Sequence, residues 1–331
     1  MPYGDGAQSY LGGDSFSGST DMADTTDAPM VGDALAGGAF WLPKPFGWKR
    51  ALRLDFTTGI TSLPSALNSW ANGVPHGTTY CGWTAANMHY SSAGITFFTD
   101  WGAYPNTQNR VPTDPDGSGS ASSGWRCGGF GTKAQFFAPC RVRVYERLLD
   151  LNIDGLNKVS QMMPRNWSDV EIDFDECGVK AGVLQQSYIR MHDGTTNGQD
   201  HLPGNPNYTA TIVGPMQRRT YQTFGRHCYE VELDNQTVTS FTDGRMDGSL
   251  KIPNAAGTDS GIWDRLCDVP RPIICQTQMY NAGLTGDHGK TSQRTIAGIE
   301  VFVKPRITPP GIPFLLGNPS NVDSYGRPLS P

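Results

Sequence analysis

The sequence of 331 residues contains no long apolar run. A transmembrane helix needs about 18 or more consecutive apolar residues, and no stretch reaches that length, so no membrane insertion is expected. The opening MPYGDGAQSYLGGDSFSGST also lacks the basic and apolar regions of a secretory signal. No export signal is therefore expected.

Basic residues are also few. The chain has 26 Lys and Arg residues against 31 Asp and Glu residues, which gives a formal net charge of -5. Because a nucleic-acid-binding surface needs concentrated positive charge, a nucleic-acid partner is not expected. The segment GLTGDHGKT (283–291) has the wrong glycine spacing for a phosphate-binding loop, and no helix pattern follows it.

Closely spaced cysteine pairs are missing. Seven cysteines, at positions 81, 127, 140, 177, 228, 267 and 275, include no CxxC pair, which disfavours a zinc ribbon or a thioredoxin-like site. Several lie in apolar runs such as PIICQ, so they are predicted to be mostly buried free thiols. No metal site and no cofactor are predicted, although a structural calcium ion is left open.

The sequence contains no convincing amphipathic helix longer than three turns. Instead, short alternating segments such as ALRLDFT, VEIDFDE and AGIEVFVKP are separated by Gly-rich clusters such as DPDGSGSASSG. This pattern favours an all-β sandwich or barrel. Residues 1–40, rich in Gly, Ser and Asp, predict a low-complexity N-terminal arm, and the Pro-rich residues 306–331 predict an extended C-terminal tail. The folded domain is predicted to span residues 41–305.

The run EIDFDE (171–176) concentrates carboxylates on a predicted strand. On a regular strand, residues 171, 173 and 175 share one face and residue 176 points away. A β-bulge between residues 173 and 176 would bring Glu176 to the face of Glu171 and Asp173, with Asp175 in the bulge. The two glutamate carboxyls could then lie roughly 5–5.5 Å apart, as in a retaining glycosidase. The alternative is an exposed strand edge that carries charges for solubility.

An E-x-D-x-x-E run with apolar second and fourth residues resembles the signature of glycoside hydrolase family 16. GWKRALRLDF (47–56) resembles that family's opening strand, and HCYEVELDNQTVTSFTDGR (227–245) resembles its H-x-Y-x-x-E-W…Y-x-D-G hairpin. AGIEVFVKP (297–305) resembles its closing strand, so the likeness covers about residues 41–305 in family order. The resemblance implies a concanavalin A-like jelly-roll sandwich of two antiparallel sheets.

The resemblance also implies roles for individual residues. Glu171 would be the nucleophile, Asp173 the assisting residue and Glu176 the general acid/base, with the pKa of Glu176 raised by burial and by its neighbours. Gln161 and Leu233 stand where the family has tryptophans that help to line the sugar cleft. Three other tryptophans and one histidine are predicted to bind the sugar instead: Trp101, Trp125, Trp167 and His192.

The expected function is that of a retaining endo-glycosidase acting on a cell-envelope polysaccharide of the β-glucan or galactan type. The opening MPYGDGAQSYLGG resembles the start of tail proteins in phages of actinobacteria. A virion tail location is therefore expected, with action outside the host cell on its surface and with residues 1–40 and 306–331 docking to other tail proteins. Two alternatives stay open: a non-catalytic glycan-binding or structural tail protein on the same sandwich, and an ordinary secreted bacterial glucanase. A homo-oligomer is also left open.

Overall fold

The computed structural model describes most of the predicted domain. The described residues are 41–69, 81–103, 123–163, 170–180, 183–184, 188–193, 199–200, 212–213, 225–252, 262–279 and 285–304. The predicted arm (1–40) and tail (306–331) lie outside the described residues.

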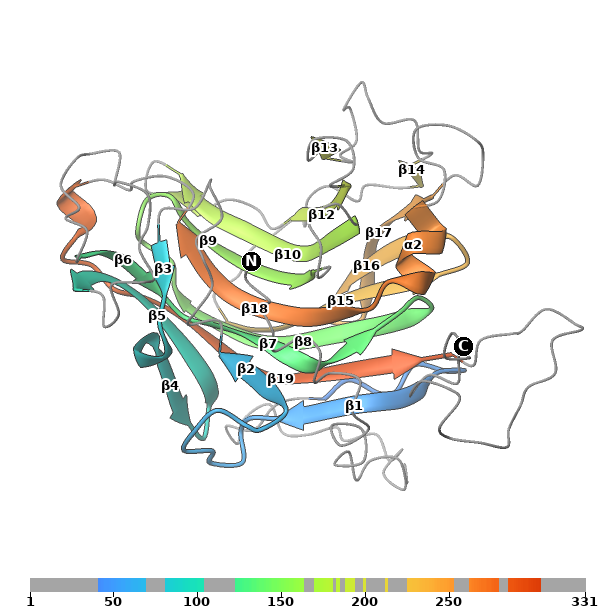
Figure 1. The fold of residues 1–331 in the computed structure, drawn as a ribbon, viewed down its shortest axis with the longest axis horizontal. Coiled ribbons are helices and arrows are strands. Elements are labelled where there is room, and N and C mark those ends of the chain that lie inside the picture. Colours follow the sequence, from blue (N-terminus) through green and yellow to red (C-terminus); the bar gives the residue numbers. More distant parts are fainter. Residues whose placement is uncertain are drawn as a thin grey trace, which may run out of the picture.

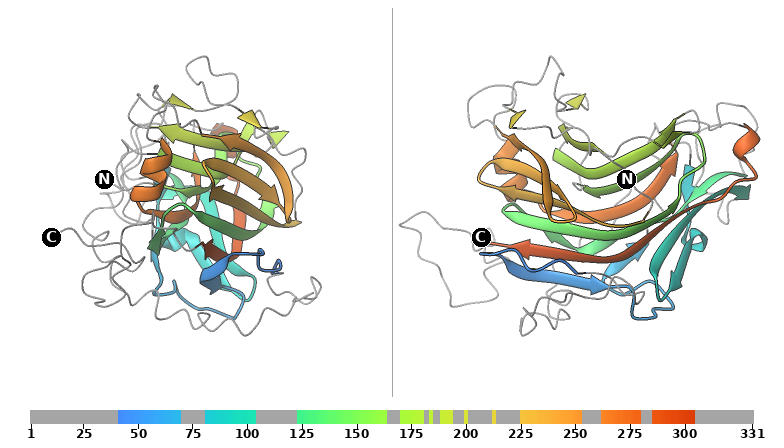
Figure 2. Two further views of the ribbon diagram at one scale, coloured as in Figure 1. Left: turned by 90° about the vertical axis from the view of Figure 1, so that its right-hand side faces the viewer. Right: turned by 180° about the vertical axis from the view of Figure 1, so that it is seen from behind.

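Two curved sheets form a β-sandwich (Figures 1 and 2). The outer sheet has the order β14 (Ile212–Val213), β17 (Arg245–Lys251), β16 (Thr237–Thr242), β15 (Gly225–Asp234), β8 (Cys140–Asp150), β19 (Ser292–Val303), β5 (Gly94–Ala103), β6 (Ser123–Cys127) and β3 (Cys81–Trp83). In the same sheet β1 (Lys49–Asp55) pairs with β19, and β4 (Met88–Ser91) pairs with β5.

The inner sheet contains the strand with the acidic run. Its order is β13 (Gln199–Asp200), β12 (Tyr188–Asp193), β10 (Val170–Lys180), β9 (Leu156–Met162), β18 (Arg271–Met279), β7 (Gly129–Phe136) and β2 (Leu67–Ser69), and β11 (Val183–Leu184) pairs with β10. The predicted all-β sandwich is thus confirmed.

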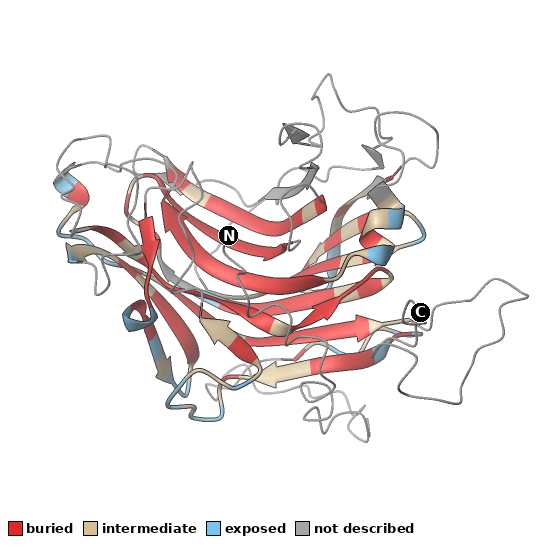
Figure 3. Cartoon of the chain, in the orientation of Figure 1, coloured by how far each residue is buried: buried red, intermediate tan, exposed pale blue. Residues whose placement is uncertain are grey.

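The main core lies between the two sheets. Ile172 of β10 belongs to the same buried cluster as Ile299 and Val301 of β19, and burying a side chain of this size contributes about 1.5–3 kcal/mol. Figure 3 shows that buried residues run along both sheets. Because neighbouring residues of a strand point to opposite faces, Glu171 and Asp173 point away from the outer sheet. We call this side of the inner sheet the carboxylate face; it is the concave side of β9, β10 and β18 in Figure 1.

Two tight turns build the hairpins of the outer sheet. The β15–β16 turn has Asn235 and Gln236 at φ of 48° and 59°, and the β16–β17 turn has Asp243 and Gly244 at φ of 52° and 79°. Two central residues at positive φ are the mark of type I′ turns, whose twist matches that of paired strands. The segment 227–245 therefore folds as a continuous meander.

One strand pair departs from the predicted antiparallel arrangement. β3 and β6 pair in parallel, with Cys81 opposite Trp125 and Trp83 opposite Cys127. The other described pairs are antiparallel. β5 runs antiparallel to β4 and to β6, so the chain reverses direction twice between β4 and β6, and β6 runs in the direction of β3.

Helices contribute little to the described part of the chain. Its α-helix, α2 (Ile262–Asp268), has two turns, and η3 (Ala85–Asn87) and η5 (Thr285–Asp287) are single 3₁₀ turns. Within the described ranges, no helix has the length and apolar character needed to cross a membrane.

The seven cysteines are free thiols. Six are buried and Cys267 is half-buried, which confirms the prediction of mostly buried free thiols. Burial raises the pKa of the Cys140 and Cys275 thiols to about 12. Because the thiolate is the reactive form, these two cysteines are unreactive near neutral pH.

Candidate active site

A β-bulge interrupts β10 inside the acidic run. In the pairing with β9, the register shifts between Asp173 and Asp175, so that Phe174 is an extra residue. In the pairing with β12, the register shifts between Asp173 and Glu176. The bulge predicted between residues 173 and 176 is therefore confirmed.

The bulge places three carboxylates on one face. Asp173 pairs with Gln161 of β9, and Glu176 pairs with Val159, two residues away on the same strand. Since residues two apart on a strand share a face, Glu176 joins Glu171 and Asp173 on the carboxylate face.

Two amide side chains of β9 hold these carboxylates. With its amide oriented to satisfy its surroundings, Gln161 donates from Nε2 to Asp173 Oδ1 at 3.0 Å and to Glu171 Oε1 at 3.2 Å. Asn157 Nδ2 donates to Glu176 Oε1 at 2.8 Å. In the sequence, Gln161 stands out only as the residue at a family tryptophan position, and no motif marks Asn157 as a site residue. The four-residue spacing of these amides on a strand beside β10 was the available signal.

The three carboxylates differ in exposure. Asp173 is 2% exposed and Glu176 is 0% exposed, whereas Glu171 is half-buried. Burial strengthens hydrogen bonds to a carboxylate because water no longer competes for it. The amide contacts of Gln161 and Asn157 therefore fix the orientation of the acidic groups.

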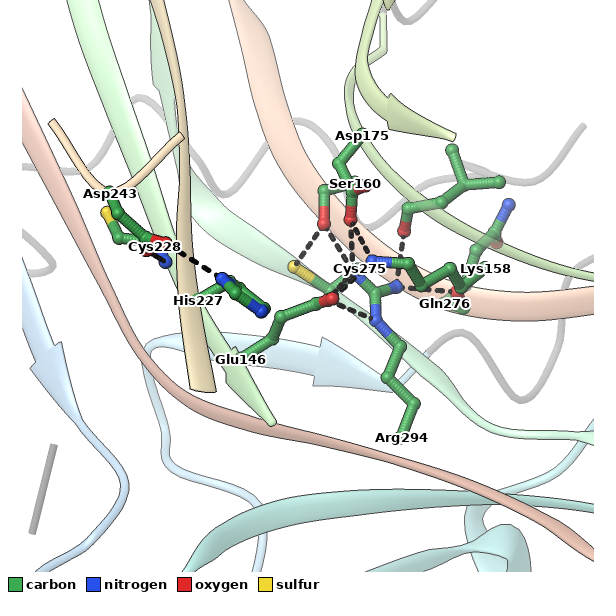
Figure 4. A network of polar contacts seen from close by, with 11 residues as sticks. Glu146, Lys158, Ser160, Asp175, His227, Cys228, Asp243, Cys275, Gln276 and Arg294 are labelled. Atoms are coloured by element: carbon green, nitrogen blue, oxygen red, sulfur yellow. Dashed lines mark hydrogen bonds and ion pairs between the residues drawn. The ribbon is translucent and has the colours of Figure 1, made fainter. Parts of the chain in front are cut away.

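Asp175 points to the opposite side, into the sandwich. It pairs with Ser160 of β9, and its Oδ2 lies 2.8 Å from Lys158 Nζ and 3.4 Å from Arg294 Nη2. Both cations also contact Glu146 of β8, with 2.7 Å from Arg294 Nη2 to Glu146 Oε2. Figure 4 shows the two cations between the two carboxylates. We call Glu146, Lys158, Asp175 and Arg294 the interior charge cluster.

Hydrogen bonds to two backbone carbonyls and to one serine side chain hold the cluster rigidly. Arg294 Nη1 donates to the carbonyl oxygens of Val159 and Gln276, each at 2.8 Å, and Nη2 donates to Ser160 Oγ at 2.5 Å. Burial alone would lower the pKa of Lys158 and of Arg294, but the carboxylates of Asp175 and Glu146 raise both pKa values above their ordinary range. Both side chains are therefore cations at neutral pH.

The predicted sugar-binding residues lie in different environments. Trp101 of β5 is half-buried and stacks on His288, with 3.7 Å between ring centroids. Trp125 has no exposed surface and packs in a core cluster with Leu156 and Cys177. This interior position gives Trp125 a packing role, and a sugar contact there would require the core to open.

The other predicted binding residues are less fully described. The backbone of His192 lies on β12 directly opposite Glu171, beside the carboxylate row. Trp167 lies outside the described residues. Leu233 is buried between the sheets, so its replacement of the family's tryptophan changes the packing of the core and not the carboxylate face. Gln161, in contrast, replaces a tryptophan on the carboxylate face itself.

The hairpin motif forms a histidine–aspartate pair between β15 and the β16–β17 turn. His227 Nδ1 lies 2.8 Å from Asp243 Oδ2, and the other oxygen of Asp243 accepts from the backbone N–H of Cys228 at 2.8 Å. The hydrogen bond that His227 donates to Asp243 raises the pKa of His227, although burial opposes the rise. The pair joins the start of β15 to the turn after β16.

This pair predicts a pH dependence of stability. Because the pKa of His227 is raised in the folded state, the pair contributes fully to the free energy of unfolding below the ordinary histidine pKa of about 6.5. This contribution is lost as pH rises through the raised pKa that His227 has in the folded protein. Urea unfolding between pH 6 and 9 should show a larger loss of stability for the wild type than for His227→Asn or Asp243→Asn. Equal losses in wild type and His227→Asn would contradict the assignment.

Comparison with known proteins identifies solved structures with a similar fold. The sequence matches no protein-family profile and no curated protein. The structure is similar to an endo-1,3-β-glucanase from Streptomyces sioyaensis, with a TM-score of 0.56, 17% identity and coverage of 80% of this chain and 100% of that chain. It is also similar to SCLam, a non-specific endo-β-1,3(4)-glucanase from glycoside hydrolase family 16 (TM-score 0.55, 14% identity, 81% and 95% covered).

A third similar structure is the laminarinase catalytic domain from Thermotoga maritima, with a TM-score of 0.53, 14% identity and coverage of 78% and 98%. Identities this low establish the fold alone. The described chain therefore has the jelly-roll β-sandwich fold seen in glycoside hydrolase family 16.

Proposed function

We propose that this protein is a retaining endo-glycosidase that cuts a cell-envelope polysaccharide of the β-glucan or galactan type. The observation that carries the proposal is the bulge of β10, which brings Glu171, Asp173 and Glu176 to one face. Two carboxyl groups on one face are the machinery that retaining glycosidases use. The similar solved structures include endo-glucanases, which supports this class of substrate.

The first step forms a covalent intermediate. The carboxylate of Glu171 attacks the anomeric carbon of the sugar, and the bond from that carbon to the leaving oxygen breaks. The acid form of Glu176 gives its proton to the leaving oxygen, so that the departing chain leaves as a neutral alcohol.

The second step releases the sugar with its original configuration. Glu176, now a carboxylate, takes a proton from a water molecule, and the resulting oxygen attacks the anomeric carbon and frees Glu171. Asn157 Nδ2 donates to Glu176 Oε1, which orients the carboxyl and assigns the transferred proton to Oε2. Asp173 and Glu171 share the amide of Gln161, which keeps the nucleophile charged and in place.

The test is a reducing-end assay on a panel of β-1,3-glucans, mixed-linkage glucans and galactans, followed by NMR of the first product. The expected result is cleavage of at least one polymer with retention of anomeric configuration. An inverted product, or no cleavage of any polymer by protein shown to be folded, would contradict the proposal.

Gln161 provides a finer test of the site. Gln161→Leu removes the donor shared by Glu171 and Asp173, and a hydrogen bond to a charged group is worth about 1.5–3 kcal/mol. The expected kcat/KM falls by about 10- to 100-fold. The acid limb of the pH profile moves to higher pH, because a lost donor disfavours the charged carboxylates. An unchanged pH profile would show that the contact has no role in the site.

Two observations favour a second function, a glycan-binding or structural protein that does not cut. Asp173 and Glu176 are 2% and 0% exposed, and an amide replaces an aromatic ring at Gln161. Affinity electrophoresis in gels that contain each polysaccharide separates the two functions. Retardation without new reducing ends would favour binding alone, and retardation with them would favour the glycosidase.

We also propose that the protein is carried on a bacteriophage tail, which would deliver it to the host surface. The proposal is supported by the likeness of MPYGDGAQSYLGG to the openings of such tail proteins. Mass spectrometry of gradient-purified virions should detect its peptides. Their absence from virions and their presence in a bacterial culture supernatant would instead favour an ordinary secreted glucanase.

A further inference from the structure

We propose that the interior charge cluster is a positioning device for Glu176. Lys158 and Arg294 bind Asp175 in the interior of the sandwich. Asp175 thereby fixes the bulge of β10 and keeps Glu176 on the carboxylate face. The kinetic consequences rest on the proposed glycosidase function, but the structural consequence does not.

Strand geometry explains why the bulge needs an anchor. Without a bulge, β10 would alternate regularly, Asp175 would point to the carboxylate face, and Glu176 would point between the sheets. The acidic run therefore contains two carboxylates that compete for the interior position. In the structure Asp175 takes this position and Glu176 does not.

The contacts of Asp175 come from both sheets. Lys158 lies on β9 beside β10, whereas Arg294 lies on β19 of the outer sheet, and both reach Asp175 Oδ2. Glu146 on β8 holds the same two cations from the other side. Because these four strands are fixed by the main core, they define one position for the carboxylate of residue 175.

The charges in the cluster are balanced. Two cations face two carboxylates, and the four side chains are at most 2% exposed. A buried ion pair adds little to stability when compared with apolar residues of the same size. Its better-supported use is to select one register among competing arrangements, which is the role we assign here.

Removing the charge of Asp175 should remove the preference of β10 for the bulged register. In Asp175→Asn, two buried cations face only one carboxylate, Glu146, and Glu176 is the nearest acidic residue on the same strand. The cations then favour a regular strand that turns Glu176 inward, away from the carboxylate face. Misplacement of a reacting group by about 1 Å already lowers a rate by about 10²-fold.

The chain offers a matched control on the far face of the outer sheet. Glu230 of β15 is also 0% exposed and pairs with two arginines, Arg141 and Arg143. Glu230→Gln therefore removes one buried carboxylate from a similar ionic environment, but on the side of the outer sheet that faces away from β10 and its bulge.

The experiment compares wild type, Asp175→Asn and Glu230→Gln, with circular dichroism showing that each is folded at the assay temperature. The expected kcat of Asp175→Asn is lower by about 10²-fold with KM changed by less than about threefold, because the acid/base and not the binding surface moves. Glu230→Gln should keep the wild-type kcat. Equal kcat values for Asp175→Asn and Glu230→Gln would overturn the proposal.

A second measurement works without any enzymatic activity. Amide hydrogen exchange of residues 170–180 should be faster in Asp175→Asn than in wild type and unchanged in Glu230→Gln, because the anchored bulge is lost only in the first variant. If the wild type cuts no polysaccharide, the proposed function fails, yet this measurement still decides the inference. Wild-type protection in Asp175→Asn would overturn it.

Should Asp175→Asn fail to fold, the double variant Asp175→Asn with Lys158→Met replaces it, so that residue 175 has neither a charge nor an apolar preference for the interior. It removes one charge of each sign and leaves Glu146 paired with Arg294, so the loss of stability is smaller. The same two readouts apply, and wild-type kcat with wild-type exchange in the double variant would again overturn the proposal.

Discussion

Replacement of Glu171 by glutamine should abolish cleavage of every polysaccharide that the wild-type protein cuts. The amide has the size and nearly the shape of the carboxylate but cannot attack the anomeric carbon. Removal of a nucleophile from an enzyme that uses covalent catalysis lowers kcat by about 10⁴-fold or more. The measurement is the rate of reducing-end formation on the most rapidly cleaved polymer.

The control for Glu171→Gln is Glu232→Gln. Glu232 is a glutamate on β15 that pairs with Arg141 and is 21% exposed. This variant should cut at the wild-type rate. Equal rates for wild type and Glu171→Gln would remove Glu171 from the catalytic machinery and, with it, the retaining mechanism.

Added azide distinguishes the roles of the two glutamates. In Glu176→Ala, with a substrate that has a good leaving group, azide attacks the glycosyl-enzyme and gives a glycosyl azide of retained configuration. In Glu171→Ala, azide takes the place of the nucleophile and gives the inverted azide. A retained azide from Glu171→Ala would show that the roles are exchanged.

Replacement of Lys158 by methionine should cause a large loss of stability. The change leaves Asp175 and Glu146 buried with Arg294 as the only cation of the cluster. Breaking a buried ion pair by removing one partner costs about 3–5 kcal/mol, because the remaining charge stays out of water. Urea unfolding at neutral pH measures the loss.

Lys304→Met provides the matched comparison. Lys304 pairs with Asp234, but its side chain is 34% exposed, and exposed pairs of this kind contribute about 0–1 kcal/mol. The midpoint of urea unfolding should therefore move far less for Lys304→Met than for Lys158→Met. Similar midpoints would mean that Asp175 and Glu146 find other partners or become protonated, and that the cluster is not a rigid unit.

Several features of the fold could be predicted because they depend on local pattern. Alternating segments predicted strands, since the pleat of a strand sends neighbouring side chains to opposite faces. The spacing of Glu171, Asp173 and Glu176 predicted a bulge, because three carboxylates with these intervals share a face only if one residue is extra. The parallel pairing of β3 and β6 was not predictable in this way, because it depends on the path of the chain between them.

Other features of the site depend on residues that meet only in the folded protein. Trp125 was predicted to bind sugar because tryptophans often do, yet in the structure it fills the core. Gln161 stands at a position where the sequence predicts only the loss of a cleft tryptophan, yet its side chain donates to Glu171 and Asp173. In both cases the residue type was visible in the sequence, but the face on which it lies was set by strand pairing.

The sequence by itself determined that this chain forms an all-β fold and that one strand holds the acidic run, because the period of side chains along a strand is a local property. Only the tertiary structure decided which carboxylate turns inward. Asp175 is selected by Lys158 and by Arg294, and Arg294 binds Glu146 across 148 positions of the chain. A buried charge takes its partners from whichever strands the core brings beside it, and no local pattern records that choice.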